Sequence, residues 1–229
     1  MPAKGIVIAI DGPVGAGKST VAQRTAERLG YLYVDSGAMY RAVALVAEEQ
    51  GIAASDAARV AEMVRRLRID LEKTVDGVRV SVDGREVTEQ IRTPRISQAA
   101  SVVATLPEVR RLLVAQLQRI GEAGGIVMEG RDIGTIVFPK AELKVYLDAS
   151  PEVRAQRRFE QQQALGLSTR LEQTREEVRE RDRRDLEREA SPLRRAPDAV
   201  YVDTTVLTAD EVVDVIVRLV RLRQETSVR

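Results

Sequence analysis

Short apolar runs recur along the chain, and longer stretches in which apolar residues return every three or four positions separate them. The apolar runs cover residues 6–10, 31–34, 126–128, 143–147 and 199–202. Strands that are apolar throughout and linked by helices are typical of parallel sheets covered on both sides. The pattern therefore predicts an α/β fold with a five-stranded parallel sheet and helices on both faces.

The helical pattern is clearest in two segments. After Ser55, a predicted N-cap, the expected inward positions are Val60, Met63, Val64 and Leu67, and in the last helix they are Val212, Val215, Ile216 and Leu219. Thr93-Pro94, Leu106-Pro107 and Ser150-Pro151 are predicted helix starts with proline in the first turn. Capping boxes are predicted from Thr169 with Glu172, before a charged helix at residues 170–189, and from Thr208 with Glu211.

The period changes to two between the second and third apolar runs. Residues 69–72, 78–82 and 85–88 alternate apolar with polar, and Asp76-Gly77 and Asp83-Gly84 separate them. Asp-Gly between alternating runs is a strong hairpin signal. We expect a small antiparallel meander here, inserted into the parallel architecture.

The first apolar run leads into a glycine-rich turn. Gly12, Gly17, Lys18 and Ser19 fit G-x-x-x-x-G-K-[ST], with a strand before and helix formers after. Such a loop points backbone N–H groups at phosphate oxygens, and the next helix adds the positive end of its dipole. Lys18 is then expected to reach the β- and γ-phosphates and Ser19 to hold Mg²⁺. Other polar segments, at 35–37, 130–132 and 148, also follow apolar runs, where parallel strands gather their ligands.

Composition limits the chemistry. The chain contains neither cysteine nor histidine, which excludes thiolate sites, Ser-His-Asp triads and histidine-ligated metals. The formal net charge is +1, so no overall field attracts nucleic acid or a membrane. The absence of a signal-like segment or a long apolar stretch leads us to expect a cytoplasmic protein. Of the 36 basic residues, 31 are arginines, a bias that fits either phosphate recognition or the base composition of the genome.

The acceptor side of a phosphoryl transfer is less evident from pattern alone. Arg41, Arg110 and Arg131 lie near predicted element ends, and Arg181, Asp185 and Arg188 share one helix face. Taken alone, that helix is more typical of a solvated helix of Glu–Arg pairs. The same choice applies to Arg154, Arg157 and Arg158. An acceptor that is itself a phosphate would need no histidine base, because its oxygen is already ionised.

Nearly the whole chain resembles the bacterial cytidylate kinases, a family of nucleoside monophosphate kinases. The resemblance rests on IDGPVGAGKST at residues 10–20, DSGAMYR at 35–41, EQIRTPR at 89–95, Ser101, PEVR at 107–110, GRDIGT at 130–135, VFP at 137–139, LDA at 147–149 and ERDRRD at 180–185. It implies a P-loop NTPase-like core at residues 1–62 and 103–229. It further implies a monophosphate-binding insert at 63–102 and a lid at about 154–170.

The resemblance also implies roles for individual residues. Lys18, Arg131 and Arg188 are the expected catalytic groups, and Ser19 the expected metal ligand. The expected ATP-binding residues are Gly12, Pro13, Val14, Gly15, Ala16, Gly17, Lys18, Ser19, Thr20, Arg157 and Arg158. CMP is expected to be held by Ser36, Arg41, Ser101, Arg110, Arg131, Asp132, Arg181, Asp185 and Arg188.

Three of these residues would read the base. Cytosine presents an amine beside two acceptors, so Asp132 and Ser101 can accept from the amine while Arg110 donates to the ring. Uracil would place a carbonyl against Asp132 and an N–H against Arg110. Without the resemblance, Ser101 would be interpreted as a helix-surface hydroxyl and Asp132 as a helix cap.

The predicted function is Mg²⁺-dependent phosphoryl transfer from ATP to CMP and dCMP by a cytoplasmic monomer with no nucleic-acid or membrane partner. One alternative is a kinase of the same fold that acts on a hydroxyl of a sugar or of shikimate. The other is a nucleotide switch or nucleic-acid-binding module that uses the arginine-rich helix, although the chain has no Asn-Lys-x-Asp motif for guanine.

Overall fold

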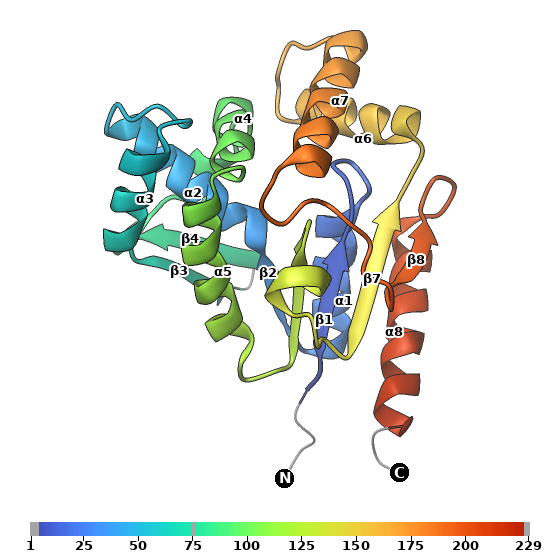
Figure 1. Ribbon diagram of the computed structural model, residues 1–229. Coiled ribbons are helices and arrows are strands. Elements are labelled where there is room, and N and C mark those ends of the chain that lie inside the picture. Colours follow the sequence, from blue (N-terminus) through green and yellow to red (C-terminus); the bar gives the residue numbers. More distant parts are fainter. Residues whose placement is uncertain (1–4, 75–76, 227–229) are drawn as a thin grey trace.

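A five-stranded parallel sheet forms the centre of the protein, and the computed structural model describes residues 5–74 and 77–226 (Figure 1). Its strand order is β2-β6-β1-β7-β8, with every neighbouring pair parallel. The strands are β1 (Val7–Asp11), β2 (Leu32–Asp35), β6 (Ile126–Gly130), β7 (Leu143–Asp148) and β8 (Val200–Asp203). The predicted α/β class is confirmed, and each apolar run forms a strand of this sheet.

Helices cover both faces of the sheet, which explains why its strands are apolar on both sides. In β1, Ile8 and Ile10 pack in one layer, whereas Ala9 between them packs in the other. The first layer includes α1 (Lys18–Leu29) and α8 (Ala209–Thr226), and the second includes α2 (Ser36–Glu49) and α5 (Pro107–Gly121). The alternation of β1 therefore serves two hydrophobic cores.

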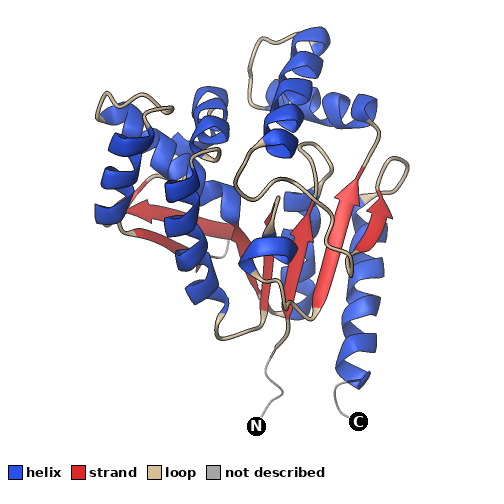
Figure 2. Cartoon of the chain, in the orientation of Figure 1, coloured by secondary structure: helices blue, strands red, loops and turns tan. Residues whose placement is uncertain are grey.

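The predicted meander is a separate antiparallel sheet of β3 (Ile69–Thr74), β4 (Gly77–Val82) and β5 (Arg85–Glu86), seen to the left of the parallel strands in Figure 2. Asp83 and Gly84 both take positive φ, 50° and 81°, as the hairpin turn requires. Asp76, in the other predicted turn, lies outside the described residues. Strand β5 ends before the expected residue 88, because the Thr88 hydroxyl accepts from the N–H of Val80 at 3.0 Å.

Beside this small sheet lie α3 (Ala57–Arg66), η1 (Gln90–Arg92) and α4 (Pro94–Val103). Helices α6 (Pro151–Ala164) and α7 (Leu171–Glu187) stand above the carboxyl ends of the parallel strands (Figure 1). A π-helical turn, η2 (Ile133–Val137), follows β6 and was not predicted. The division into core, insert and lid stays a prediction. No helix of the described residues is long and apolar enough to cross a membrane.

Most of the predicted helix starts are confirmed. The hydroxyl of Thr93 accepts from the N–H of Ile96 at 3.3 Å, and that of Ser150 accepts from Val153 at 3.3 Å. The capping box of α8 is complete, since the Glu211 N–H donates to the Thr208 hydroxyl at 3.3 Å and the Glu211 carboxylate accepts from the Thr208 N–H at 2.8 Å.

Three local predictions are wrong. Helix α3 is capped by Asp56 rather than Ser55, because the Asp56 carboxylate accepts from the Arg59 N–H at 3.1 Å. Helix α7 has no side-chain cap, and the Thr169 hydroxyl is instead 3.3 Å from that of Thr174. In α8, Val215 is 39% exposed, because the helix turns Val213, Val217 and Val220 toward the sheet instead.

Candidate active site

One large pocket opens over the carboxyl ends of the parallel strands, with a volume of about 1220 Å³. Among the residues predicted to bind substrates, only Gly12 and Pro13 are outside its lining. The lining includes Val14, Gly15, Ala16, Gly17, Lys18, Ser19, Thr20, Ser36, Arg41, Ser101, Arg110, Arg131, Asp132, Arg157, Arg158, Arg181, Asp185 and Arg188. Residues as far apart in the sequence as Val14 and Arg188 thus share one cavity.

The loop between β1 and α1 is held in a shape that requires glycine. Gly15 has φ +79°, and a Cβ there would lie 2.5 Å from the carbonyl oxygen of Arg154. At Gly12 a Cβ would lie 2.0 Å from the carbonyl oxygen of Leu147. The loop therefore packs its backbone directly on β7 and α6, which a larger residue would prevent.

Lys18 lies under this loop rather than in solvent. Its ammonium donates to the carbonyl oxygen of Pro13 at 2.6 Å, and the residue is 5% exposed. Burial, with the positive charge of Arg131 as the second cause, lowers the pKa of Lys18 to about 7. A phosphate chain in the loop would counteract both causes, because its negative charge favours the charged lysine.

Asp11, at the end of β1, fixes the start of the next functional segment. Its carboxylate accepts from the N–H groups of Ile133 and Gly134 at 2.8 and 2.7 Å. Burial raises the pKa of Asp11 to about 6, in spite of these two hydrogen bonds. This anchor places the adjacent Asp132 at the pocket wall.

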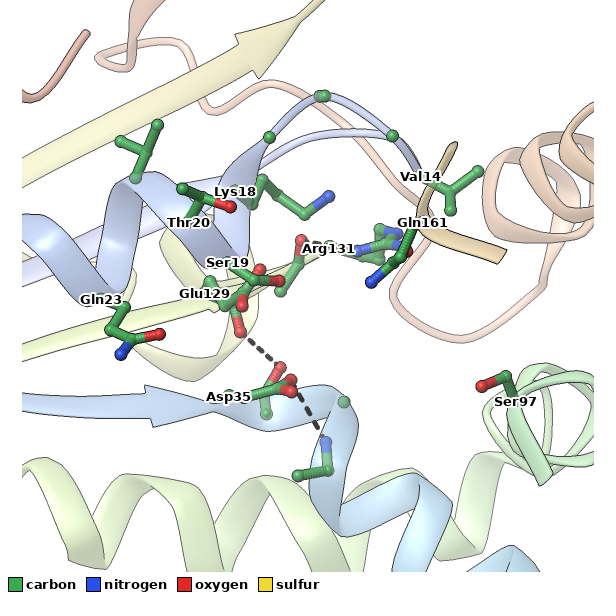
Figure 3. Close-up of a pocket in the computed structure, with 18 of the residues that line it drawn as sticks. Val14, Lys18, Ser19, Thr20, Gln23, Asp35, Ser97, Glu129, Arg131 and Gln161 are labelled. Carbon is green, nitrogen blue, oxygen red and sulfur yellow. Dashed lines mark hydrogen bonds between the residues drawn. The ribbon is translucent and has the colours of Figure 1, made fainter. Parts of the chain in front are cut away.

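An oxygen-rich corner lies beside Lys18 and Ser19, as Figure 3 shows for Glu129 at the end of β6 and Asp35 at the end of β2. The Tyr33 hydroxyl donates to Glu129 at 2.7 Å, and Ser19 lies beside the same carboxylate. Burial and the nearby Asp35 charge raise the pKa of Glu129. No group of three or more carboxylates in the described chain could hold a metal by itself. The donor set nevertheless fits Mg²⁺, which takes few protein oxygens and completes its shell with water and phosphate.

The first turn of α2 faces the same corner. Arg41 donates to Asp35 at 2.6 Å, and although burial opposes ionisation, this guanidinium holds the pKa of Asp35 below its usual value. The Ser36 hydroxyl donates to the backbone carbonyl of Glu129 at 2.7 Å, which ties α2 to β6. Both side chains are therefore placed where a second phosphate could sit opposite the loop.

The far end of the pocket contains an unusually buried ion pair. Arg110 of α5 is 2% exposed and donates to the carboxylate of Asp132 at 2.5 Å, and to the carbonyl oxygen of Ala104 at 3.1 Å. The Ser101 hydroxyl, on α4, has no hydrogen-bond partner in the described structure, and neither does Nε of Arg110. Buried polar atoms without partners are rare, so this end is suited to a polar ligand.

Helix α7 adds the remaining charges. Asp185 accepts from Arg131 at 2.8 Å, and although burial opposes it, the charges of Arg131 and Arg181 hold the pKa of Asp185 below its usual value. Arg188 lies 3.6 Å from Asp132 and 3.8 Å from Asp185, so it bridges the two carboxylates. The predicted helix face thus points inward and is not a solvated one.

Three further arginines differ in what they bind. Arg157 is held by the hydroxyl and carbonyl of Thr204, at 2.9 and 2.6 Å, and Arg158 donates to Gln161 at 2.7 Å. For Arg181, burial and the neighbouring Arg131 lower the pKa to about 10, and its Nε has no hydrogen-bond partner within the described part. The cluster carries more positive than negative charge where an anion would bind.

Sequence reasoning missed several residues of this site. Glu129 and Tyr33 meet across two strands, and Tyr40 lies against Arg110. The only signal for Glu129 was its place directly before Gly130-Arg131-Asp132. Tyr40 stands in the same segment as Ser36 and Arg41, but its position had no assigned role.

Known proteins resemble this chain over almost all of its length. The family model described as cytidylate kinase matches residues 8–222. The chain belongs to the cytidylate kinase family. It is 47% identical to the cytidylate kinase of Limosilactobacillus reuteri (strain DSM 20016) over 223 residues, covering 97% of this chain and 98% of that protein. It is 48% identical to the cytidylate kinase of Bacillus subtilis (strain 168) over 217 residues, covering 95% and 97%.

Among solved structures, an uncharacterized protein from Eubacterium ventriosum ATCC 27560 matches with a TM-score of 0.52 and 11% identity, covering 95% of this chain and 99% of that one. At this identity the likeness concerns the fold alone. The family membership confirms the resemblance on which the site residues were predicted. The role of each residue remains a prediction.

Proposed function

We propose that this cytidylate kinase family member transfers the γ-phosphoryl group of ATP to CMP and to dCMP, with Mg²⁺. The observation that carries the proposal is the buried Arg110–Asp132 pair beside Ser101, in the same cavity as the phosphate-binding loop. Such a cavity has one end for a phosphate chain and another for a hydrogen-bonding base. The family and its relatives support CMP as the acceptor.

The donor end would hold ATP through backbone and Lys18. The N–H groups of the loop and the first turn of α1 present a positive cradle, and the Lys18 ammonium can leave the Pro13 carbonyl for phosphate oxygens. Arg157 and Arg158 reach the same cavity from α6, the predicted lid. Closure of this helix over the phosphates would exclude water and so limit ATP hydrolysis.

The acceptor phosphate would lie opposite, against Ser36, Arg41, Arg131 and Arg188. Its oxygen is the nucleophile and is ionised at neutral pH, so no base has to remove a proton. The bond from this oxygen to the γ-phosphorus forms as the bond to the β-phosphate oxygen breaks, and ADP leaves. Lys18, Arg131 and Arg188 stabilise the charge on the transferring group.

The metal would be held by the Ser19 hydroxyl, which lies beside the carboxylate of Glu129. The chemistry that Mg²⁺ supplies when bound is neutralisation of the phosphate oxygens. The charge of Lys18 acts on Glu129 and that of Arg41 acts on Asp35, so each carboxylate has a positive group near it.

The base and sugar would occupy the remaining groups. Asp132 and Ser101 would accept from the cytosine amine and Arg110 would donate to the ring, so uracil would meet repelling groups. Arg181 and Asp185 would contact the sugar. We further propose a cytoplasmic monomer without nucleic-acid or membrane partners. The net charge of +1 supports the absence of attraction to nucleic acid or membrane, and the family resemblance supports the monomer.

The test is a coupled assay of ADP release from ATP, with CMP, dCMP, UMP, AMP and GMP compared as acceptors. Each acceptor is measured once in the presence of Mg²⁺ and once with excess chelator. We expect CMP and dCMP to exceed the other acceptors by orders of magnitude in kcat/KM, and the chelator to abolish the activity. A chain that binds ATP but shows no preference among monophosphates would refute the acceptor assignment, and a hydroxyl compound would then be the better candidate.

A further inference from the structure

Tyr40 lies inside the base-reading end of the pocket, yet no role was predicted for it. It belongs to α2, lines the cavity and is only 7% exposed. The Arg110 guanidinium carbon lies over its ring, 5.2 Å from the centroid. The hydroxyl of Tyr40 is buried and has no hydrogen-bond partner in the described parts of the chain.

The ring completes the support of Arg110. One side of this guanidinium meets the Asp132 carboxylate, another donates to the Ala104 carbonyl, and the face rests on the Tyr40 ring. A cation over an aromatic face is strongly attracted when water is excluded, as it is at 2% exposure of Arg110. The ring therefore restricts the plane in which Arg110 can present its N–H groups.

The hydroxyl of Tyr40 lies among charged groups, whereas its ring contacts Arg110. The charges of Arg110, Asp132 and Arg188 all act on it, so it lies among the predicted base-binding groups. Burial raises the pKa of Tyr40 to about 12, and the group is therefore a neutral donor at physiological pH. A buried donor without an acceptor is costly unless a ligand completes it.

We propose that Tyr40 acts in pyrimidine recognition in two ways: its ring positions Arg110 in line with Asp132, and its hydroxyl binds the base directly by donating to an acceptor that cytidine and uridine nucleotides share. This inference rests on the proposed function, because it assumes that Arg110 and Asp132 read the base. The two parts of the side chain have separable effects. The ring acts on the choice between cytosine and uracil, whereas the hydroxyl acts on the affinity for both.

The experiment compares Tyr40→Phe with Tyr40→Leu, measuring kcat/KM for CMP and UMP in each. Tyr40→Phe keeps the ring, and we expect KM to rise on the order of tenfold for both substrates with the CMP-to-UMP ratio unchanged. Tyr40→Leu also removes the ring, and we expect the ratio itself to fall by on the order of tenfold or more. A purely structural role would not change that ratio.

The chain offers a matched control. Tyr201 on β8 also lies under an arginine, Arg195, at 5.6 Å, but on the surface at the edge of the sheet. Tyr201→Leu should leave both the ratio and KM at wild-type values. Thermal melts and ATP titration check that each variant is folded, and Tyr40→Met replaces Tyr40→Leu if the latter does not fold.

The outcomes separate the role of the Tyr40 ring, the role of its hydroxyl and the proposed function. An unchanged ratio in folded Tyr40→Leu or Tyr40→Met overturns the positioning role, and unchanged KM values in Tyr40→Phe overturn the role of the hydroxyl. A wild-type enzyme without any preference for CMP would instead contradict the proposed function, so the two failures are distinct.

Discussion

Arg154 of α6 donates to Asp182 of α7 at 2.6 Å, and the same guanidinium nitrogen donates to the carbonyl oxygen of Val14 in the phosphate-binding loop at 3.1 Å. Its Nε donates to the Ala149 carbonyl at 3.1 Å. One buried side chain thus connects the loop for the donor with the helix that carries Asp185 and Arg188. The ion pair between Arg154 and Asp182 is therefore one link between the two ends of the pocket.

We expect Asp182→Ala to destabilise the protein by about 3 kcal/mol, because the buried Arg154 loses the nearer of its two carboxylate partners and keeps only Asp148, at 3.9 Å. The loop carbonyl of Val14 would lose its fixed donor, and ATP affinity should fall on the order of tenfold. Denaturant unfolding and ATP titration measure the two effects. Glu180→Ala on the same helix removes an exposed 3.0 Å pair with Arg183 and should cost below ~1 kcal/mol. Equal losses in the two variants would contradict the link.

ATP binding should take up a proton above neutral pH. Lys18 has its pKa lowered to about 7 by burial and by Arg131, so at pH 8 it is mostly neutral before ATP binds. Bound phosphates favour the charged lysine, and the affinity for ATP should therefore decrease as pH rises above about 7. Calorimetry at pH 8 in buffers of different ionisation enthalpy measures the uptake. Lys18→Arg, charged at every pH tested, should show none, and a wild type without uptake would refute this account.

The metal dependence should shift when the hydroxyl next to Lys18 is removed. In Ser19→Ala we expect the Mg²⁺ concentration that gives half-maximal activity to rise by about tenfold or more, since Mg²⁺ would lose its protein ligand. Binding of metal-free ATP in excess chelator should stay near the wild-type affinity. If both affinities fall together, Ser19 supports the loop and does not bind the metal.

A comparison of Gly15→Ala with Gly51→Ala should separate two causes of lost stability, the steric clash of a new Cβ with α6 and the strain of a left-handed backbone. Gly15→Ala would meet the Arg154 backbone at 2.5 Å, while Gly51→Ala at φ +64° has open space around the new Cβ. Both variants lose about 1 kcal/mol to the left-handed backbone, but Gly15→Ala should lose several kcal/mol and its ATP binding. Similar unfolding midpoints for the two variants would show that the loop can move away from α6.

Local motifs could be predicted from the sequence because their chemistry lies within a few residues. The loop from Gly12 to Ser19 and the box of Thr208 and Glu211 are of this kind. The Thr169–Glu172 pattern failed, since a threonine can equally bond within the next turn, as Thr169 does with Thr174. The pattern of spacing alone does not decide between those partners.

The acceptor end could not be built from local pattern. Ser101, Arg110 and Asp132 come from α4, α5 and the end of β6, and only the family resemblance linked them. Tyr33 with Glu129 and Tyr40 with Arg110 remained unseen, because each pair joins segments that are about 70 to 100 residues apart. Such contacts depend on strand order and helix packing, which a single sequence does not specify.

The most direct test of the account is the CMP-to-UMP ratio of kcat/KM in wild type and in Asp132→Ala, with Asp132→Asn as a variant of similar shape. Loss of the carboxylate that receives the cytosine amine should reduce a ratio of several orders of magnitude to within about tenfold of unity. Thermal melts confirm that Arg110 tolerates the loss of its partner. A ratio that stays at the wild-type value in a folded variant would show that Asp132 does not read the base.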